Sequence, residues 1–295
     1  MLKRIFLGLL ALALAIGVAG FSTQSETAAK PISVYLDGKK LAFDVNPTID
    51  NGRVLVPLRT IFEELGVKVN WDPATKKITA EKNGQRINVD VDVKIVNNRA
   101  LVPLRFVSEK LGAMVGWDAP SRTVIINTAP GKQVKVTRVV DGDTLEVDWD
   151  GKTEKVRLIG VDTPESVHPD ASRNTAEGKT AAEYTKTQLE GKTVIVCTDV
   201  QERDKYGRIL GYVFVDGNFY NAKLVSEGYA QVATFPPNVK WVDLFTALQA
   251  DARAEKRGLW AGEGAAVPAV PSQSVQGTKP ALKYDPKGPD RNCSD

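Results

Sequence analysis

The sequence predicts an α+β protein with two domains: a duplicated strand–helix–strand domain, then a five-stranded β-barrel with about three helices. Two observations lead to this prediction. A block of nine residues starting at Asn51 returns at Asn97, so residues 30–128 contain an internal repeat. Residues 131–263 contain five short strand-like segments and three segments with helical spacing of apolar residues. The chain has 295 residues, which is enough for two domains of ordinary size.

Residues 1–29 have the layout of a secretory signal peptide and a mature N-terminus. Lys3 and Arg4 precede an almost purely apolar run, Ile5–Gly20, and small residues follow. We therefore expect a secreted or cell-surface-associated protein, with an uncleaved membrane anchor as the alternative. No later segment has eighteen consecutive apolar residues, so we expect no membrane span after signal removal.

Each copy of the repeat predicts the same elements. A strand ends at a Leu-Val-Pro step, and Pro57 and Pro103 suit the first turn of the helix that follows. Gly66 and Gly112 are natural helix stops. Two strands then complete each copy, at Val67–Trp71 and Lys77–Glu81 in the first and at Ala113–Trp117 and Thr123–Asn127 in the second.

The two Val-Pro-Leu-Arg blocks and the two Trp-Asp turns resemble the stalk-like domain named after the copper amine oxidase N-terminus. The resemblance implies an accessory domain with a possible cell-wall or surface ligand for residues 30–128. It does not imply copper, because this segment contains neither His nor Cys. The recurring Trp and Arg positions have two interpretations: core packing with buried ion pairs, or a ligand surface.

The second domain, residues 131–263, begins with a three-stranded meander joined by Asx-Gly turns. A helix, two more strands and two more helices follow. The predicted strands are Val134–Val140, Thr144–Trp149, Glu154–Val161, Thr193–Asp199 and Arg208–Val215. The predicted helices are Lys179–Glu190, Phe219–Glu227 and Trp241–Lys256. Five strands with helices suit a small closed barrel of the OB type.

Acidic residues gather beside two strand ends of the meander. Asp141 and Asp143 follow the first strand, and Asp162 and Glu165 follow the third. If the barrel curls, these carboxylates converge and would repel one another without a cation. Oxygen ligands favour Ca²⁺ or Mg²⁺. The chain's one histidine, His168, reads as a solvated loop residue.

Two arginines accompany these acids. Arg157 lies on the third strand, and Arg208 follows the segment Asp204–Gly207. A cation, two guanidinium groups and a spare carboxylate are what phosphodiester hydrolysis needs. Taken singly, each feature is also ordinary, because Asp-Gly is a turn signal and a strand arginine is often a surface pair.

Three blocks, Val140–Thr144, Val156–Glu165 and Asp204–Arg208, resemble the signature blocks of the thermonuclease (staphylococcal-nuclease-like) family in order and spacing. The resemblance implies an OB barrel with three helices that hydrolyses DNA and RNA and leaves 3′-phosphate ends. It implies a Ca²⁺ site built from Asp143, Asp162 and the Thr163 carbonyl, with Asp141 nearby.

The same resemblance implies roles for the remaining residues. Glu165 would act on the attacking water, directly or through the metal shell, while Arg157 and Arg208 would hold the transition-state phosphate. Lys205 and Tyr206 would contact a neighbouring phosphate. This chain departs from the family at Thr234-Phe235-Pro236-Pro237, where only Phe235 can stack on a base.

The resulting hypothesis is a secreted, calcium-dependent nuclease. The alternatives are a non-catalytic nucleic-acid-binding OB module and a surface-binding protein that carries the nuclease as cargo. The charge balance matters here: residues 30–130 hold 15 basic and 11 acidic residues, and residues 131–263 hold 18 and 21. Nucleic acid at the second domain must therefore be held by local charges or a metal ion.

The last segment, residues 264–295, reads as a flexible linker with a short acidic tail that contains Cys293. The other cysteine, Cys197, lies on a predicted barrel strand, and we expect one face of that strand to look outward. Two arrangements follow: a bond between the two cysteines, or a buried Cys197 with Cys293 unpaired or joined to another molecule.

Overall fold

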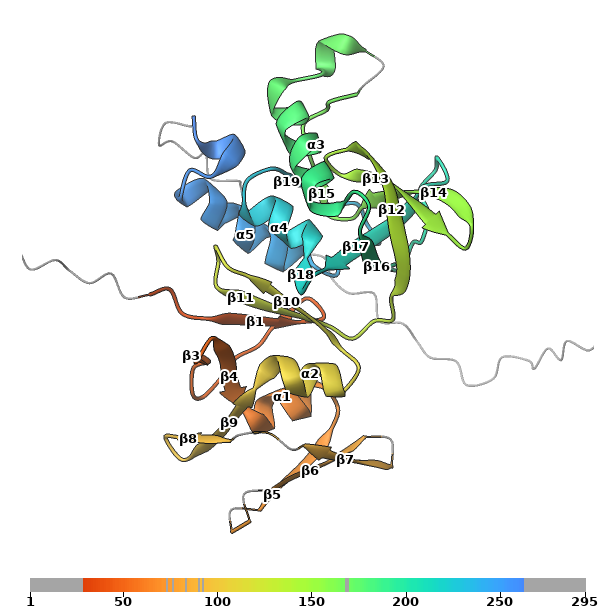
Figure 1. Ribbon diagram of the computed structural model, residues 1–295. Coiled ribbons are helices and arrows are strands. Elements are labelled where there is room, and N and C mark those ends of the chain that lie inside the picture. Colours follow the sequence, from red (N-terminus) through yellow and green to blue (C-terminus); the bar gives the residue numbers. More distant parts are fainter. Residues whose placement is uncertain are drawn as a thin grey trace, which may run out of the picture.

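The computed structural model describes residues 29–262, except 73, 76, 83, 90, 92, 168 and 169. The predicted signal peptide, the C-terminal tail with Cys293, and His168 lie outside the described residues. Two bodies pack against each other, the repeat domain below and the barrel domain above in Figure 1. Among the described helices, none is long and apolar enough to cross a membrane.

The two copies of the repeat fold alike around a strand that leads into a short helix. β4 (Arg53–Pro57) runs into α1 (Leu58–Glu64), and β9 (Arg99–Pro103) runs into α2 (Leu104–Lys110). The prolines end the strands and cap the helices; they do not occupy the first helical turn as predicted. Both helices end at a glycine with positive φ, as the sequence predicts.

The repeat domain contains three sheets. β4 and β9 pair with each other at the centre of the first, flanked by β3 (Thr48–Asp50) and β8 (Lys94–Val96). The second sheet is the antiparallel set β5 (Lys68–Asp72), β6 (Lys77–Lys82) and β7 (Gln85–Val89). The third has the order β10-β11-β1-β2, formed by Met114–Asp118, Thr123–Asn127, Ser33–Leu36 and Lys39–Lys40. The N-terminal strand β1, which the sequence did not reveal, completes the second copy by pairing in parallel with β11.

The core of the repeat domain is apolar, and its arginines stay outside it. Ile61 and Phe62 of α1 are fully buried. The ion pairs Arg99–Asp44 and Arg105–Glu109 leave about half of each side chain exposed. The prediction of buried ion pairs at the recurring arginines was therefore wrong: a guanidinium keeps its hydration by staying at the surface.

The second domain is a closed five-stranded barrel, as predicted. Its strands are β12 (Lys132–Asp141), β13 (Thr144–Trp149), β14 (Lys152–Leu158), β16 (Thr193–Cys197) and β17 (Ile209–Val215). Their order is β14-β13-β12-β16-β17, and a parallel pairing of β14 with β17 closes the barrel. Closure brings the ends of distant strands together, which positions the site described below.

Three helices and several short elements cover the barrel (Figure 1). They are α3 (Ala176–Leu189), α4 (Tyr220–Ser226), α5 (Val242–Ala254), the 3₁₀ turns Ala171–Arg173 and Gly258–Trp260, and the short strands β15 (Val161–Asp162), β18 (Asn218–Phe219) and β19 (Gln231–Val232). Helix α3 begins three residues before its predicted start because the Thr175 hydroxyl caps it, accepting a hydrogen bond from Gly178 N at 2.9 Å.

The two domains share buried contacts along β10 and β1. Trp117 N donates to Gly217 O at 3.1 Å, and Tyr35 and Ile125 belong to the barrel's core cluster. Cys197 lies at this junction, where Asn127 Nδ2 is 3.6 Å from its sulfur. The expectation that Cys197 is accessible was therefore wrong, because the repeat domain covers the outer face of its strand; only 1% of the residue is exposed.

Candidate active site

The meander brings the two acidic segments of the sequence together, because β13 and β14 pair with Thr144 opposite Arg157. Asp143 sits in the turn between β12 and β13, and Thr163 follows β15. The Thr163 amide donates to Asp143 Oδ2 at 2.9 Å, although 20 residues separate the two along the chain. The two acidic segments therefore contact each other at Asp143 and Thr163, but among the described residues no three acidic side chains gather into a metal cluster.

Arg157 of β14 joins two of these carboxylates. Its Nη1 lies 2.7 Å from Asp143 Oδ2, and its Nη2 lies 2.7 Å from Asp162 Oδ1. Nη1 also donates to the Val161 carbonyl at 2.9 Å. Only 15% of the Arg157 side chain and 8% of the Asp143 side chain are exposed, so this pair is shielded from water. Arg157 is thus held rigidly at the mouth of the barrel.

The surroundings of Asp143 disfavour the charged form of its carboxyl group. Burial raises its pKa above the ordinary value, and Asp162 and Asp141 raise it further. The Arg157 charge and the Thr163 amide act in the opposite direction without cancelling the rise. The positive charge of Arg157 therefore does not fully offset the effects of burial and of the neighbouring carboxylates on Asp143.

The donor set fits a hard divalent cation. Asp143, Asp162 and Asp141 offer carboxylate oxygens, and Thr163, which contacts Asp143, offers a backbone carbonyl; these oxygen donors are the ligand chemistry of Ca²⁺. Among the described residues, no three His, Cys, Asp or Glu side chains already converge as a metal cluster. In this arrangement Arg157 pairs with two of the carboxylate oxygens that a cation would use.

The segment after β15 is fastened next to this cluster. Ser166 Oγ donates to Asp141 Oδ1 at 2.7 Å. The half-buried Glu165 accepts a hydrogen bond from Thr175 N at its carbonyl oxygen, at 3.0 Å. A Cβ at Gly178 would collide with that carbonyl, so the start of α3 packs closely on Glu165. The backbone of Glu165 is thereby fixed between the start of α3 and Ser166, which contacts Asp141.

A second group of predicted residues is organised by the turn at residues 204–208. Asp204 Oδ1 accepts the amides of Tyr206 and Arg208, both at 2.9 Å, and Asp204 Oδ2 lies 2.7 Å from Arg208 Nε. Burial raises the pKa of Asp204, but the hydrogen bonds from Arg208 outweigh it and the net pKa is lowered. Two cations lie near the Tyr206 ring, since Lys205 Nζ is 5.0 Å and the Arg208 guanidinium 5.5 Å from its ring centre.

A cavity of about 480 Å³ extends from this turn to Arg157, the arginine that contacts Asp143 and Asp162. It is lined by five of the predicted site residues, which are Arg157, Lys205, Tyr206, Arg208 and Phe235. Tyr206 and Phe235 are 73% and 72% exposed, so each offers an aromatic face to solvent. The structure therefore gathers the predicted residues in two groups that share Arg157: carboxylates on one side, cations and aromatic rings on the other.

Sequence reasoning missed the residues that hold this site in shape. Asp204 lies in the block Asp204–Arg208, but the resemblance assigns it no role. Its position two residues before Tyr206 suits an Asx turn. Ser166 had no signal beyond its place beside Glu165. Gly142 belongs to one of the predicted Asx-Gly turns, and a Cβ there would lie 2.7–2.9 Å from Thr163 side-chain atoms. Its lack of a side chain allows the two acidic segments to touch.

Comparison with known proteins agrees with this geometry. The family described as staphylococcal nuclease homologue matches residues 155–262, and the copper amine oxidase N-terminal domain matches residues 35–92 and 79–126. The thermonuclease of Staphylococcus hyicus is 39% identical over 141 residues, which is 48% of this chain and 83% of that protein. The thermonuclease of Staphylococcus intermedius is 42% identical over 130 residues, covering 44% of this chain and 77% of that protein.

A further relative has the same activity class in its name. Endonuclease YncB of Bacillus subtilis is 38% identical over 137 residues, 45% of this chain and 64% of that protein. The family match at residues 155–262 contains Asp162, Glu165, both arginines and the residues that line the cavity. This chain therefore belongs to the thermonuclease family, and its barrel domain is a nuclease.

Proposed function

We propose that this nuclease is exported, requires Ca²⁺, and hydrolyses phosphodiester bonds of DNA or RNA to leave 3′-phosphate ends. The observation that supports this best is the position of Arg157, which contacts Asp143 and Asp162 and also lines the cavity with Arg208. A phosphate bound between the two arginines would thus lie next to the candidate cation ligands.

The residues of this chain divide the work as follows. Arg157 and Arg208 bind non-bridging phosphate oxygens, whose negative charge grows in the transition state. Glu165 accepts the proton of a water that attacks phosphorus, and the bond to the 5′ oxygen breaks. That oxygen leaves with a proton from solvent, so the products are a 3′-phosphate and a 5′-hydroxyl.

Calcium, held by Asp143, Asp162 and the Thr163 carbonyl with Asp141 nearby, would supply positive charge beside the reacting phosphate. Arg157 would then be released from one or both carboxylates, because the cation takes over their neutralisation. Lys205 and Tyr206 contact the adjoining phosphate, and Phe235 stacks on one base of the bound strand.

The metal requirement is tested by digesting single-stranded DNA in Ca²⁺ and in excess chelator. We expect cleavage only with Ca²⁺, and calorimetric titration should give one Ca²⁺ site that Asp143→Asn removes. Gel analysis with a phosphatase step identifies the 3′ ends. Undiminished cleavage in chelator, or an unchanged calcium titration for Asp143→Asn, would contradict the assignment.

Export and domain division are part of the same proposal. The basic start and apolar run at residues 1–29 support a cleaved signal, so we expect N-terminal sequencing of protein recovered from culture medium to start after residue 19. Retention of the whole protein in the membrane fraction would favour an uncleaved anchor. Residues 30–128 and 131–263 are the proposed domains, with residues 264–295 as linker and tail.

A further inference from the structure

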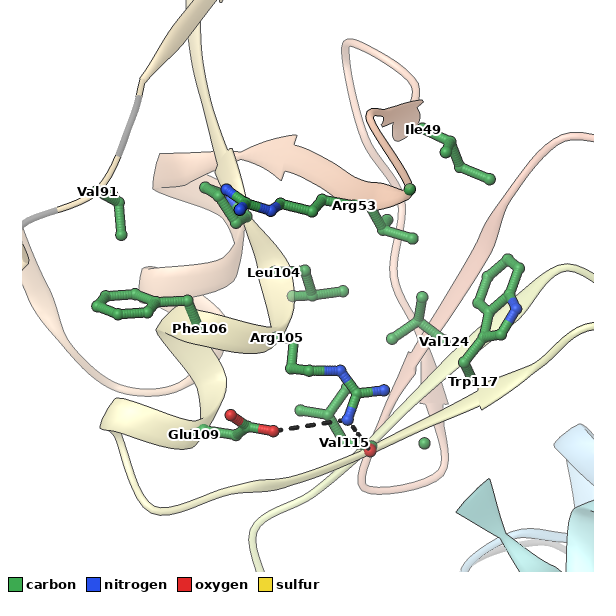
Figure 2. A pocket seen from close by; sticks show the side chains of 14 residues that line it. Ile49, Arg53, Val91, Leu104, Arg105, Phe106, Glu109, Val115, Trp117 and Val124 are labelled. Atoms are coloured by element: carbon green, nitrogen blue, oxygen red, sulfur yellow. Dashed lines mark hydrogen bonds and ion pairs between the residues drawn. The ribbon is translucent and has the colours of Figure 1, made fainter. Parts of the chain in front are cut away.

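The repeat domain contains a cavity that the nuclease reaction does not use. It measures about 850 Å³ and lies between the hairpin β3–β4, helix α2 and strands β10 and β11. Its floor is apolar, built from residues such as Leu104, Val115 and Val124. Its rim is formed by Arg53, Arg105 and Trp117, with Phe106 and Glu109 beside them (Figure 2).

Both copies of the repeat contribute to this cavity. Arg53 comes from the first copy, whereas Arg105 and Trp117 come from the second. Within the described residues Arg53 has no ion-pair partner, while its counterpart Arg99 lies 2.6 Å from Asp44. The recurring Arg and Trp positions therefore have different surroundings in the two copies, and the first copy's Arg53 is available for an external anion.

The polar groups are arranged around the aromatic rings. Figure 2 shows Phe106 and Trp117 on opposite sides of Arg105. The Arg105 guanidinium is only loosely held, at 3.6 Å from Glu109 and 3.4 Å from the Val115 carbonyl, and half of its side chain is exposed. An incoming anion can replace these weak contacts at little cost. Trp117 packs partly on the core and presents the rest of its ring to the cavity.

A cavity lined by two arginines, an indole and apolar side chains suits a ligand that is anionic and has flat rings. A single-stranded nucleic acid has this composition, since each nucleotide joins a phosphate to a base that stacks on aromatic side chains. The charge distribution favours the same ligand, because the repeat domain has an excess of 4 basic residues (15 against 11) and the nuclease domain a deficit of 3 (18 against 21).

We propose that this cavity is a second nucleic-acid site, which binds one nucleotide of a single strand whose other part lies in the nuclease domain. Arg53 and Arg105 bind phosphate, and Trp117 stacks on a base. The cavity wall β10 also contacts the nuclease domain, where Trp117 N bonds to Gly217 O at 3.1 Å. The cavity therefore lies on a strand that packs directly against the nuclease domain. A long strand gains affinity from both sites, whereas a trinucleotide occupies the catalytic site alone.

The test measures binding of the full-length protein to a fluorescent, cleavage-resistant phosphorothioate oligothymidylate of about 30 nucleotides. The variants are Arg53→Glu and Trp117→Ala. Arg99→Glu is the matched control, because it makes the same charge change at the equivalent position of the other copy. Thermal unfolding of each variant checks the fold, and Arg53→Glu is informative even if Trp117→Ala unfolds, since Arg53 is exposed.

We expect Arg53→Glu and Trp117→Ala each to weaken binding of the long strand by roughly tenfold, the size typical of losing one stacking or phosphate contact. For Arg53→Glu the slope of log affinity against log salt should fall by about 0.7, the value for one phosphate contact on a single strand. Cleavage of a trinucleotide should be unchanged. The binding assay needs neither metal nor catalysis, so its outcome is independent of the proposed calcium mechanism.

Equal affinities for wild type, Arg53→Glu and Arg99→Glu would overturn the proposal. So would an equal loss in Arg53→Glu and Arg99→Glu, because that result would indicate a diffuse charge effect. A third contrary outcome is Arg53-dependent binding of polygalacturonate without Arg53-dependent binding of the oligonucleotide, which would assign the cavity to acidic glycans.

Discussion

Arg157 Nη1 lies 2.7 Å from Asp143 Oδ2, and both side chains are nearly buried. Through this contact Arg157, which we propose acts in catalysis, also stabilises the barrel. Removing the arginine leaves a buried carboxylate without its charge partner, which typically costs about 3–5 kcal/mol. The other arginine proposed for catalysis differs, since 29% of the Arg208 side chain is exposed.

The first prediction uses this contrast. We expect Arg157→Ala and Arg208→Ala both to lower kcat by about a hundredfold or more, because each removes a cation from the transition-state phosphate. Only Arg157→Ala should also lower the free energy of unfolding by several kcal/mol, measured by urea denaturation. Equal stability of the two variants would show that the Arg157–Asp143 contact contributes little to folding. A rise in KM alone would mean that the arginines only hold substrate.

The second prediction concerns Asp204 as a positioning residue. Asp204→Asn keeps an oxygen to accept the amides of the turn but loses the charged partner of Arg208 Nε, so we expect kcat to fall by about tenfold with little change in KM. Glu154→Gln is the control, because it breaks the exposed Arg203–Glu154 pair of the same loop without touching Arg208. A fall of the same size in the control would assign the effect to general loop loosening.

The pKa of Asp204 sets the pH range of this effect. Its pKa is lowered, so the anchoring of Arg208 is complete at neutral pH and is lost only as pH falls through that depressed value. The ratio of wild-type to Asp204→Asn rates should therefore stay constant from pH 8 to about pH 4, the ordinary aspartate range. A ratio that shrinks already near pH 6 would mean that another group limits Arg208.

The third prediction tests Gly142. A methyl group there would lie 2.7–2.9 Å from the Thr163 side chain and push the Thr163 segment away from Asp143. We expect Gly142→Ala to weaken Ca²⁺ binding in calorimetry and to reduce the cleavage rate together. The control Gly151→Ala has nothing within 4 Å but has φ of +78°. It should lose stability by about 1 kcal/mol and keep full activity.

The fourth prediction concerns the thiol of Cys197. Burial raises its pKa to about 11, so at pH 8 only about one thiol in a thousand is ionised, and the repeat domain blocks access to it. We expect no reaction with a thiol reagent in the native protein and full reaction in denaturant. Residues 131–262 expressed alone should react, because Asn127 and Met114, which contact the sulfur, are then absent.

The cysteine result also bears on the tail. Mass spectrometry after non-reducing digestion should return Cys197 as a free thiol. Recovery of a Cys197–Cys293 peptide would show that the tail penetrates the junction between the domains, and rapid labelling of the native protein would show that the junction opens readily.

Local patterns predicted most of the barrel. Strand β13 has its predicted bounds, Thr144–Trp149, because its alternation is bracketed by two Asx-Gly turns. Strand β1 was not predicted, because its partner β11 lies 90 residues away and no pattern near Ser33 indicates the pairing. Parallel pairing depends on tertiary structure, which a local pattern does not contain.

The same distinction between local patterns and tertiary contacts holds for the candidate site. Sequence blocks identified Asp143, Asp162 and Arg157, but a block does not show which residues of another block it contacts, such as Asp143 and Thr163. Which face of β16 is covered was not predictable either, since alternation distinguishes two faces without saying what packs on each. The cover at Cys197 comes from a different domain.

The pairing of β1 with β11 has a mechanical consequence. The two strands run in the same direction, and the nuclease domain follows the end of β11. A pull between residue 29 and the nuclease domain would draw the start of one strand and the end of the other in opposite directions. All hydrogen bonds of the pair would then be loaded at once in shear, whereas an antiparallel pair pulled from its open end separates one bond at a time. A protein held by its N-terminus in flowing liquid would meet that pull with its most resistant geometry.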